Sequence, residues 1–263
     1  MSGPFVMTIT NRKGGVGKTT TVVNLAAAWQ ATGRRVLVLD LDAQGHASWG
    51  LGRKAVSRQE ASIHRLFREE AAEGPMIVAS RLPGLDLVPA ERSFEERHSM
   101  VKRDLLAQWI RQVASKSAYE VVLIDTPPVL GTLMINALHA ADMVLVPFVP
   151  HFLGLDGVQQ LVRLADYLRS SAEETQQQGR LLLLPVMVDK RLKQHREVID
   201  AVLNQFGRER VLLPGIRNNI RIAEAFGYAQ SVLEYAPESS GAEDYRNLVN
   251  QLQAAGPAHE QGV

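Results

Sequence analysis

The sequence predicts an α/β fold in which a mostly parallel, twisted β-sheet is flanked by helices on both faces. Short apolar runs of strand length alternate along the chain with longer stretches of helical periodicity. The apolar runs lack strict alternation, which is typical of strands that are buried on both faces. Because strand–helix–strand order places successive strands in parallel, the pattern indicates one sheet covered by helices on each side.

Seven apolar runs are predicted to be strands and five stretches to be helices. The predicted strands are Phe5–Thr10, Arg35–Leu41, Leu85–Val88, Val121–Asp125, Met143–Phe148, Leu181–Val188 and Val211–Leu213. The predicted helices are Thr19–Ala31, Ile63–Ala71, Leu133–Ala140, Leu155–Ser171 and Gln194–Phe206. We expect a single domain over residues 1–263, with residues 1–4 and about 255–263 frayed.

Composition narrows the function classes. Of 263 residues, 46% are hydrophobic, enough for one sizeable core. Lys and Arg total 29 and Asp and Glu total 28, so the net charge of +1 neither demands nor excludes a polyanionic partner. The absence of cysteine excludes disulfides and thiolate-held metal or iron–sulfur sites. No signal peptide pattern is present, and runs such as Leu181–Val188 are too short to span a bilayer, so we expect a cytoplasmic protein.

The strongest motif is Gly-Gly-Val-Gly-Lys-Thr-Thr at Gly14–Thr20, which follows a predicted strand and opens a predicted helix. Glycines let the backbone turn tightly and bring its N–H groups against phosphate oxygens, and the helix N-terminus adds partial positive charge. Lys18 can reach the β- and γ-phosphates of a nucleotide, and the Thr19 hydroxyl can ligate Mg²⁺. The loop is a variant, because Lys13 stands where the usual spacing has glycine. A plain Gly-rich turn is the alternative, but the context favours a P-loop NTPase.

Acidic residues end two of the predicted strands. Asp125 closes an apolar strand and precedes Thr126-Pro-Pro, where an acid can hold Mg²⁺, usually through a water molecule. Asp40 and Asp42 lie at the end of the second predicted strand, Arg35–Leu41, where the strand ends of such sheets bind ligands. Their alternative role is that of turn and cap residues. Combined with the phosphate loop, the three acids predict a magnesium–nucleotide site.

These motifs resemble the ParA/Soj branch of the ParA–MinD family, the ATPases with a deviant Walker A loop. The matching segments are Lys13–Thr20, Asp40–Gly45, Leu123–Pro128 and Asn219–Ala225 followed by Gly227. The resemblance covers Val6 to about Leu252, and the chain is similar to the short forms because it begins at its first strand. The resemblance implies a Mg²⁺-dependent ATP hydrolase with a weak intrinsic rate, which dimerises around two ATP molecules.

The family pattern also implies residue roles. Lys13 would cross the dimer interface to the partner's phosphates, while Lys18 and Thr19 would bind phosphate and Mg²⁺ within one subunit. Asp42 would position or activate the attacking water. Asp40 would lie near the metal, and Asp125 would support it. The implied nucleotide-binding residues are Lys13, Gly14, Gly15, Val16, Gly17, Lys18, Thr19, Thr20, Pro214 and Asn219.

The adenine loop departs from the family pattern. In relatives, the loop after the last central strand packs on the base, and here that loop is Pro214–Asn219. Relatives often have Pro-Arg-Asn, whereas this chain has Arg217-Asn218-Asn219. The departure shifts a positive charge by one position, so the sequence does not define which residues contact the base.

Soj-like members bind DNA non-specifically as ATP dimers, which implies a cationic surface here. Flexible cations bind phosphates additively, and no aromatic residues interleave with them to stack on bases. An ordinary solvated helix face is the alternative. The implied DNA-binding residues are Lys190, Arg191, Lys193, Arg196, Arg217 and Arg221.

The sequence does not indicate which cargo or which adaptor protein this chain would bind. Family members segregate plasmids or chromosomes with a ParB-like partner, and others space carboxysomes (the McdA type) or chemotaxis clusters on the nucleoid. We therefore expect a cytoplasmic, nucleoid-associated dimer with a ParB-like or other cargo-adaptor protein.

Three other classes of protein fit the sequence less well. A MinD-like positioning ATPase at the membrane needs a basic amphipathic C-terminal helix, but Gln251–Val263 contains no Lys or Arg, so no membrane partner is expected. A reductase like the nitrogenase iron protein needs cysteine ligands for its cluster. A bacterial tyrosine kinase would carry a tyrosine-rich tail, which this chain lacks.

Overall fold

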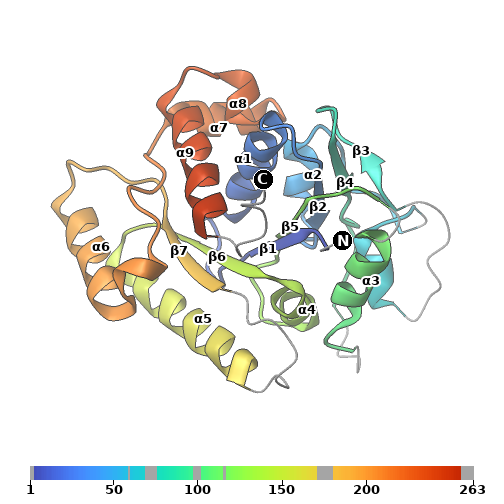
Figure 1. The fold of residues 1–263 in the computed structure, drawn as a ribbon, viewed down its shortest axis with the longest axis horizontal. Coiled ribbons are helices and arrows are strands. Elements are labelled where there is room, and N and C mark those ends of the chain that lie inside the picture. Colours follow the sequence, from blue (N-terminus) through green and yellow to red (C-terminus); the bar gives the residue numbers. More distant parts are fainter. Residues whose placement is uncertain are drawn as a thin grey trace, which may run out of the picture.

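One sheet organises the molecule (Figure 1). The computed structural model describes residues 3–58, 60–68, 76–96, 102–114, 117–170 and 180–255. Within them, seven strands lie in the order β3-β4-β2-β5-β1-β6-β7. Every neighbouring pair is parallel except β3 with β4, which confirms the predicted mostly parallel sheet. The strands are β1 (Phe5–Ile9), β2 (Val36–Asp40), β3 (Val78–Ala79), β4 (Leu85–Val88), β5 (Val121–Asp125), β6 (Met143–Phe148) and β7 (Arg180–Pro185).

Helices cover both faces of this sheet, as the sequence predicts. Figure 1 shows α1, α7, α8 and α9 over one face and α4 and α5 over the other. The α-helices are α1 (Lys18–Ala31), α2 (His46–Gly50), α3 (Leu105–Ala114), α4 (Thr132–Ala140), α5 (Phe152–Ser170), α6 (Lys193–Phe206), α7 (Ile220–Gly227), α8 (Val232–Tyr235) and α9 (Ser240–Ala255). Two short 3-10 helices are η1 (Ile63–Phe67) and η2 (Arg208–Arg210).

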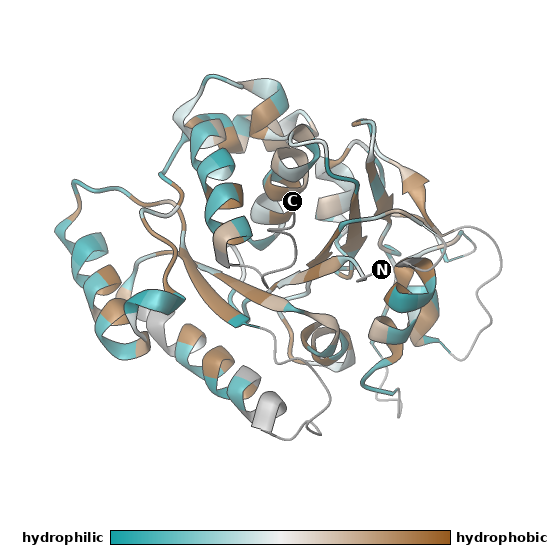
Figure 2. Ribbon diagram, in the orientation of Figure 1, coloured by the Kyte–Doolittle hydropathy of each residue, from teal (hydrophilic) through white to brown (hydrophobic). Residues whose placement is uncertain are grey.

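The two-residue period of the central strands explains the two layers of core. Met7 and Ile9 of β1 pack in the cluster formed with α1 and α9, whereas Val6 packs in the cluster that includes α3 and α4. Successive side chains of a strand point to opposite faces, so a strand with apolar residues at every position buries both faces. A third cluster lies between β6, β7, α5 and α6. Figure 2 shows hydrophobic colouring along the strands and hydrophilic colouring over much of α6 and α9.

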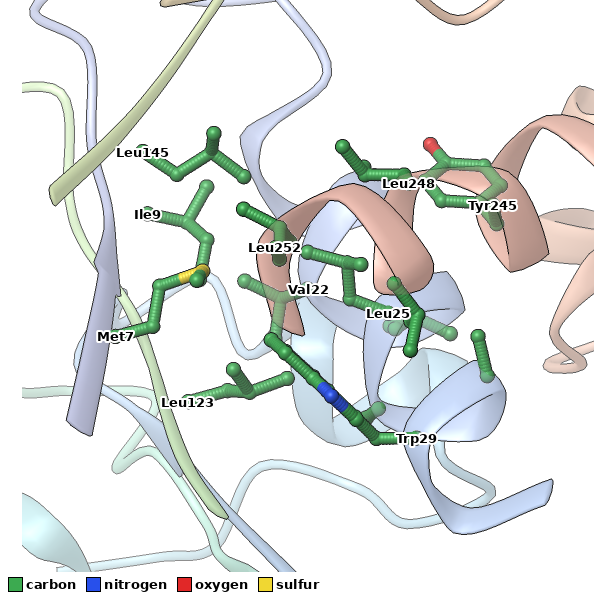
Figure 3. Close-up of a cluster of buried hydrophobic side chains, with 14 of the residues drawn as sticks. Met7, Ile9, Val22, Leu25, Trp29, Leu123, Leu145, Tyr245, Leu248 and Leu252 are labelled. Atoms are coloured by element: carbon green, nitrogen blue, oxygen red, sulfur yellow. The ribbon is translucent and has the colours of Figure 1, made fainter. Parts of the chain in front are cut away.

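The cluster under α1 and α9 locks the helix that begins at the phosphate loop (Figure 3). Leu25 of α1 is fully buried, and Trp29 one turn later is 2% exposed. From α9, Tyr245, Leu248 and Leu252 pack into the same cluster. Burying side chains of this size stabilises the fold by about 1.5–3 kcal/mol each, so α9 fixes α1 firmly on the sheet.

Some boundaries differ from the sequence prediction. Val211–Leu213 is not a strand, because it makes one isolated bridge from Val211 to Leu183 before Pro214, which lacks an N–H, turns the chain. The helix predicted at Ile63–Ala71 is η1, a single 3-10 stretch, and residues 69–71 lie outside the described part. β7 ends at Pro185 rather than at Val188.

Several elements were not predicted at all. These are the short antiparallel β3, the helices α2, α3, α7, α8 and α9, and the 3-10 helix η2. The predicted frayed ends fall mostly on residues 1–2 and 256–263, which lie outside the described part. Among the described helices, none has the length and apolar content that crossing a bilayer requires.

Leu248→Ala tests the role of α9. Leu248 is 2% exposed, so its truncation should lower the free energy of unfolding by about 2–5 kcal/mol, through lost burial and the cavity left behind. Asn247→Ala is the matched control, because Asn247 is exposed on the same helix and should change stability by less than about 0.5 kcal/mol. Urea unfolding of both variants gives the comparison. Equal losses would contradict a packing role for α9.

Candidate functional site

The phosphate loop joins β1, a central strand of the sheet, to α1. Gly15 and Gly17 adopt φ angles of 72° and 77°, in the left-handed region that glycine occupies without strain. Gly17 directly precedes α1, and no side chain caps this helix. The helix N-terminus therefore presents uncapped backbone N–H groups and positive partial charge toward the loop, as an anion site requires.

Lys18 is the positively charged side chain inside the phosphate loop. Its side chain is buried, with the residue 7% exposed, and Nζ donates to the Lys13 carbonyl oxygen at 3.2 Å. Burial lowers the pKa of Lys18, although the charges of Asp125 and Asp42 counteract this. A buried ammonium with one carbonyl partner is strongly stabilised by a nearby anion, so the interior of the loop is suited to phosphate.

Two carboxylates lie side by side at the same edge of the sheet. Asp40 ends β2 and Asp125 ends β5, and the two residues are register partners. Both are fully buried. Burial raises the pKa of Asp40 to about 7 and raises the pKa of Asp125 well above its usual value, with the charge of Asp40 adding to the effect. Each would ionise more readily beside a cation.

Thr19 links the loop to this acidic pair. Its Oγ1 donates to Asp125 Oδ2 at 2.8 Å, while Asp125 Oδ1 is buried and has no hydrogen-bond partner. An orphaned carboxylate oxygen beside a hydroxyl is a donor set that suits Mg²⁺ or a water bound to it. Among the described residues no three side chains form a ready-made metal site, so such an ion would also need phosphate oxygens.

Ser48 is a site residue that the sequence prediction missed. It is fully buried on α2, and both its backbone N–H and its hydroxyl donate to Asp40 Oδ2, at 2.7 Å and 2.6 Å. These bonds fix the Asp40 carboxylate and favour its charged form. Ser48 lies eight positions beyond Asp40 in an unremarkable stretch, so only the turn into α2 reveals the contact.

Asp42 lies in the turn between β2 and α2 and is half-buried. The Leu41 N–H donates to the Asp125 carbonyl oxygen at 3.0 Å, which ties this turn to the end of β5. Asp42 Oδ1 accepts from the Gln44 N–H at 3.0 Å, and its charge raises the pKa of Lys18. The structure therefore brings Asp42, Asp125 and Lys18 into one electrostatic site.

Lys13 has a different position from Lys18. The residue is exposed, and its backbone N–H donates to Asn11 Oδ1 at 2.9 Å. Asn11 is buried and anchored to the Pro147 carbonyl oxygen at 2.8 Å. The start of the loop is thus held firmly, while the Lys13 side chain is directed to the surface.

The segment predicted to hold the base lies beside β7. The Val188 N–H donates to the Ile216 carbonyl oxygen at 2.9 Å, and the Asn218 N–H donates to the Val188 carbonyl oxygen at 3.0 Å. Pro214 is exposed. Asn219 caps α7 by accepting from the Arg221 N–H at 2.9 Å and also donates to Ser240 Oγ at 2.9 Å. The hydrogen bonds of the Asn219 side chain therefore stabilise the start of α7 and its contact with α9.

The six cations predicted for DNA binding separate into three groups. Four surround the start of α6 and are exposed, and Arg221 is exposed on α7 with Glu224 as its ion-pair partner at 2.8 Å. Arg217 differs, because its guanidinium bonds to Asp244 and Glu243 at 2.7 Å each, and these bonds raise the pKa of Arg217. The group of four, called the α6 cations below, is Lys190, Arg191, Lys193 and Arg196.

Lys18→Ala tests the phosphate site directly. Removing the buried ammonium leaves the phosphates without their cation inside the loop, so nucleotide affinity should fall by at least about a hundredfold. Titration calorimetry with ATP and Mg²⁺ measures the change. Lys54→Ala, on an exposed residue outside the loop, is the control and should bind as the wild type does. Unchanged affinity in Lys18→Ala would place the nucleotide elsewhere.

Comparison with known proteins identifies the family. A family described as "AAA domain" matches residues 5–177. The chain is 35% identical to the chromosome partitioning protein ParA of Caulobacter vibrioides (strain NA1000 / CB15N), over 94% of this chain and 93% of the relative. It is 33% identical to the sporulation initiation inhibitor protein Soj of Bacillus subtilis (strain 168), over 95% and 99%.

Solved structures show the same fold with its ligands. The ATP complex of a Cyanothece McdA variant superposes with a TM-score of 0.83 at 18% identity, covering 99% of this chain and 100% of the other. Cobyrinic acid a,c-diamide synthase of Mycobacterium smegmatis, with ADP and magnesium bound, gives a TM-score of 0.78 at 28% identity, over 98% and 99%. ATP and Mg²⁺ are therefore the cofactors expected of this site. The phosphate loop, the paired acids and these relatives together show that the chain belongs to the ParA/Soj family of P-loop ATPases.

Proposed function

We propose that this chain is a ParA-type ATP switch that dimerises on ATP, binds DNA non-specifically and segregates or positions a cargo. The observation that supports this most is the exposure of Lys13 beside a loop whose interior already holds Lys18. Hydrolysis is slow until a ParB-like or other adaptor stimulates it, and the protein resides on the nucleoid. The chromosome partitioning relatives support this class of cargo.

Charge is the reason for dimerisation. The triphosphate of ATP carries more negative charge than Lys18 and one divalent cation neutralise. Lys13 of a second copy supplies a further positive charge when two loops face each other. Exposed apolar residues flank the same edge of the sheet, with Val129 and Leu130 after β5 and Phe152 after β6. They give the proposed interface an apolar rim.

The chemical step then needs few groups. Lys18 and the N–H groups at the start of α1 hold the phosphates, and Mg²⁺ offsets the charge that develops on them when it is bound. Asp42 orients the attacking water and accepts its proton, because it is half-buried, whereas Asp40 and Asp125 are fully buried.

Asp42→Ala should produce an ATP-bound dimer that does not turn over. Without the carboxylate the water is not oriented, while Lys13, Lys18 and Thr19 still hold the nucleotide. Sedimentation with ATP and Mg²⁺ should show a stable dimer, and ADP should leave monomers. Adding Lys13→Ala to Asp42→Ala should restore monomers in ATP. A monomeric Asp42→Ala protein in ATP would refute the role given to Asp42.

The DNA surface that we propose is formed by the α6 cations together with Arg221. Arg191 is the most exposed of those with an ion pair, at 89% for its side chain, and its partner Asp189 lies two residues away at 2.8 Å. Lys193 is 81% exposed. Exposed cations of this kind bind phosphates without reading sequence, and their contribution falls as salt rises. Arg217 is left out, because two carboxylates hold its guanidinium, one of them on the 4% exposed side chain of Asp244, and its own side chain is only 39% exposed.

Arg191→Glu should weaken DNA retention by roughly tenfold at moderate salt while leaving ATP affinity unchanged. The plot of log affinity against log salt should become shallower by about one unit for each lost phosphate contact. The control is Arg246→Glu, an exposed residue on α9 with the same change in charge. Fluorescence anisotropy with a random duplex distinguishes the variants. Equal weakening in both would indicate a bulk charge effect and remove the α6 cations from the proposal.

A further inference from the structure

His64 connects the irregular segment between α2 and β4 to the acidic turn of the site. The residue lies on η1 and is fully buried. Its Nε2 lies 3.0 Å from the carbonyl oxygen of Leu41, the residue between Asp40 and Asp42. Its Nδ1 accepts the backbone N–H of Glu91 at 2.9 Å. One imidazole therefore bridges the acidic turn and the segment that follows β4.

The hydrogen bonds define which nitrogen carries the proton. Because the Glu91 N–H donates to Nδ1, Nδ1 bears no hydrogen, and the proton of the neutral ring lies on Nε2. Burial lowers the pKa of His64 to about 4, so the ring is neutral at neutral pH. Nε2 is thus a donor, and its bond to the buried Leu41 carbonyl has the length of an ordinary hydrogen bond.

Leu41 is held from two sides. Its N–H donates to the Asp125 carbonyl oxygen at 3.0 Å, and its carbonyl accepts from His64 at 3.0 Å. Its side chain is fully buried. A rotation of the peptide between Leu41 and Asp42 would break the bond to His64 and leave a buried carbonyl without a partner, which is unfavourable. The direction in which Asp42 leaves the backbone is therefore set in part by the imidazole.

Neighbouring groups keep the imidazole in place. The His64 ring stacks on Phe94 with centroids 4.2 Å apart and planes 10° apart. The guanidinium of Arg68 lies 5.6 Å from the centroid of the Phe94 ring and pairs with the buried Glu91. A ring fixed by stacking and by a backbone N–H has a single orientation available, as a group that positions another must have.

We propose that His64 is a positioning residue for ATP hydrolysis, which holds the Leu41 carbonyl and thereby aims the Asp42 carboxylate at the attacking water. His64 does not touch the nucleotide, so it acts on the chemical step and not on binding. The inference rests on the role of Asp42 given under the proposed function. It extends that role to a segment far from the phosphate loop in the sequence.

Two substitutions separate the two bonds of the ring. His64→Gln places an amide N–H₂ at about the reach of Nε2, so it can still donate to Leu41. His64→Asn places an amide oxygen at about the reach of Nδ1, so it can still accept from Glu91 but is too short for Leu41. Both lose the ring stacking and one hydrogen bond, and both should lower the unfolding midpoint to a similar extent.

We expect His64→Asn to lower kcat about tenfold, with the dissociation constant for ATP within about twofold of wild type, because only the aim of Asp42 is lost. His64→Gln should keep kcat within about threefold of wild type. Turnover is measured with ATP, Mg²⁺ and a random duplex present, together with ATP affinity and the unfolding midpoint. A kcat equal in the two variants, or one that follows the midpoint, would overturn the inference, as would a parallel loss of ATP affinity.

A third variant and a parallel measurement complete the test. Phe94→Leu removes the stacked ring and leaves both bonding groups of His64, so kcat should fall to an intermediate value with normal ATP affinity. An unchanged kcat in Phe94→Leu contradicts the inference even if His64→Asn fails to fold. Asp42→Ala, assayed alongside, separates the two proposals. Hydrolysis by Asp42→Ala at the wild-type rate refutes the proposed role of Asp42, whereas an inactive Asp42→Ala beside a fully active His64→Asn refutes only the role of His64.

Discussion

Two fully buried carboxylates, Asp40 and Asp125, set the chemistry of the whole site. Because β2 and β5 pair in parallel, the two carboxylates lie side by side at the carboxyl ends of these strands. Burial there raises the pKa of both groups. A pair of this kind is stable in its charged form only when cations approach it. Within the chain, Lys18 supplies a positive charge, and Thr19 and Ser48 donate hydrogen bonds to Asp125 and Asp40. The fold thus builds a site that is incomplete until a cation and a phosphate arrive together.

The sheet explains why the phosphate loop can meet that pair. β1 lies next to β5, and the loop that leaves β1 returns as α1, which α9 presses onto the sheet. The position of Thr19 relative to Asp125 therefore depends on packing at Trp29 and Leu248, well away from the loop. On the other side, the turn that carries Asp42 is tied to β5 through Leu41. Contacts from both layers of the core meet at one cluster of polar groups.

The sequence could predict what local patterns encode and little of what distant contacts decide. The succession of most strands along the chain, the phosphate loop and the acids at the ends of two strands follow from apolar runs and from spacing. Arg217 was predicted to face DNA, but it is paired with Asp244, which lies 27 positions further along and on a helix that the sequence did not indicate. Neither Ser48 nor His64 was predicted to contact the Asp40–Asp42 segment, because each contact depends on a turn whose path is fixed by packing. Residue type alone gives no sign that a buried serine or histidine faces a site.

The different positions of Lys13 and Lys18 explain how the proposed switch could couple ATP binding to dimerisation. Lys18 is buried, and its charge is balanced within one subunit by acids of the same site. Lys13 is exposed at the start of a loop that Asn11 anchors, so its backbone is rigid while its charge is free to pair outside the subunit. In the proposed dimer, loss of the terminal phosphate removes the negative charge that holds the second lysine, and the two copies separate. A single buried lysine could bind ATP, but it could not report to a second subunit whether the phosphate is still there.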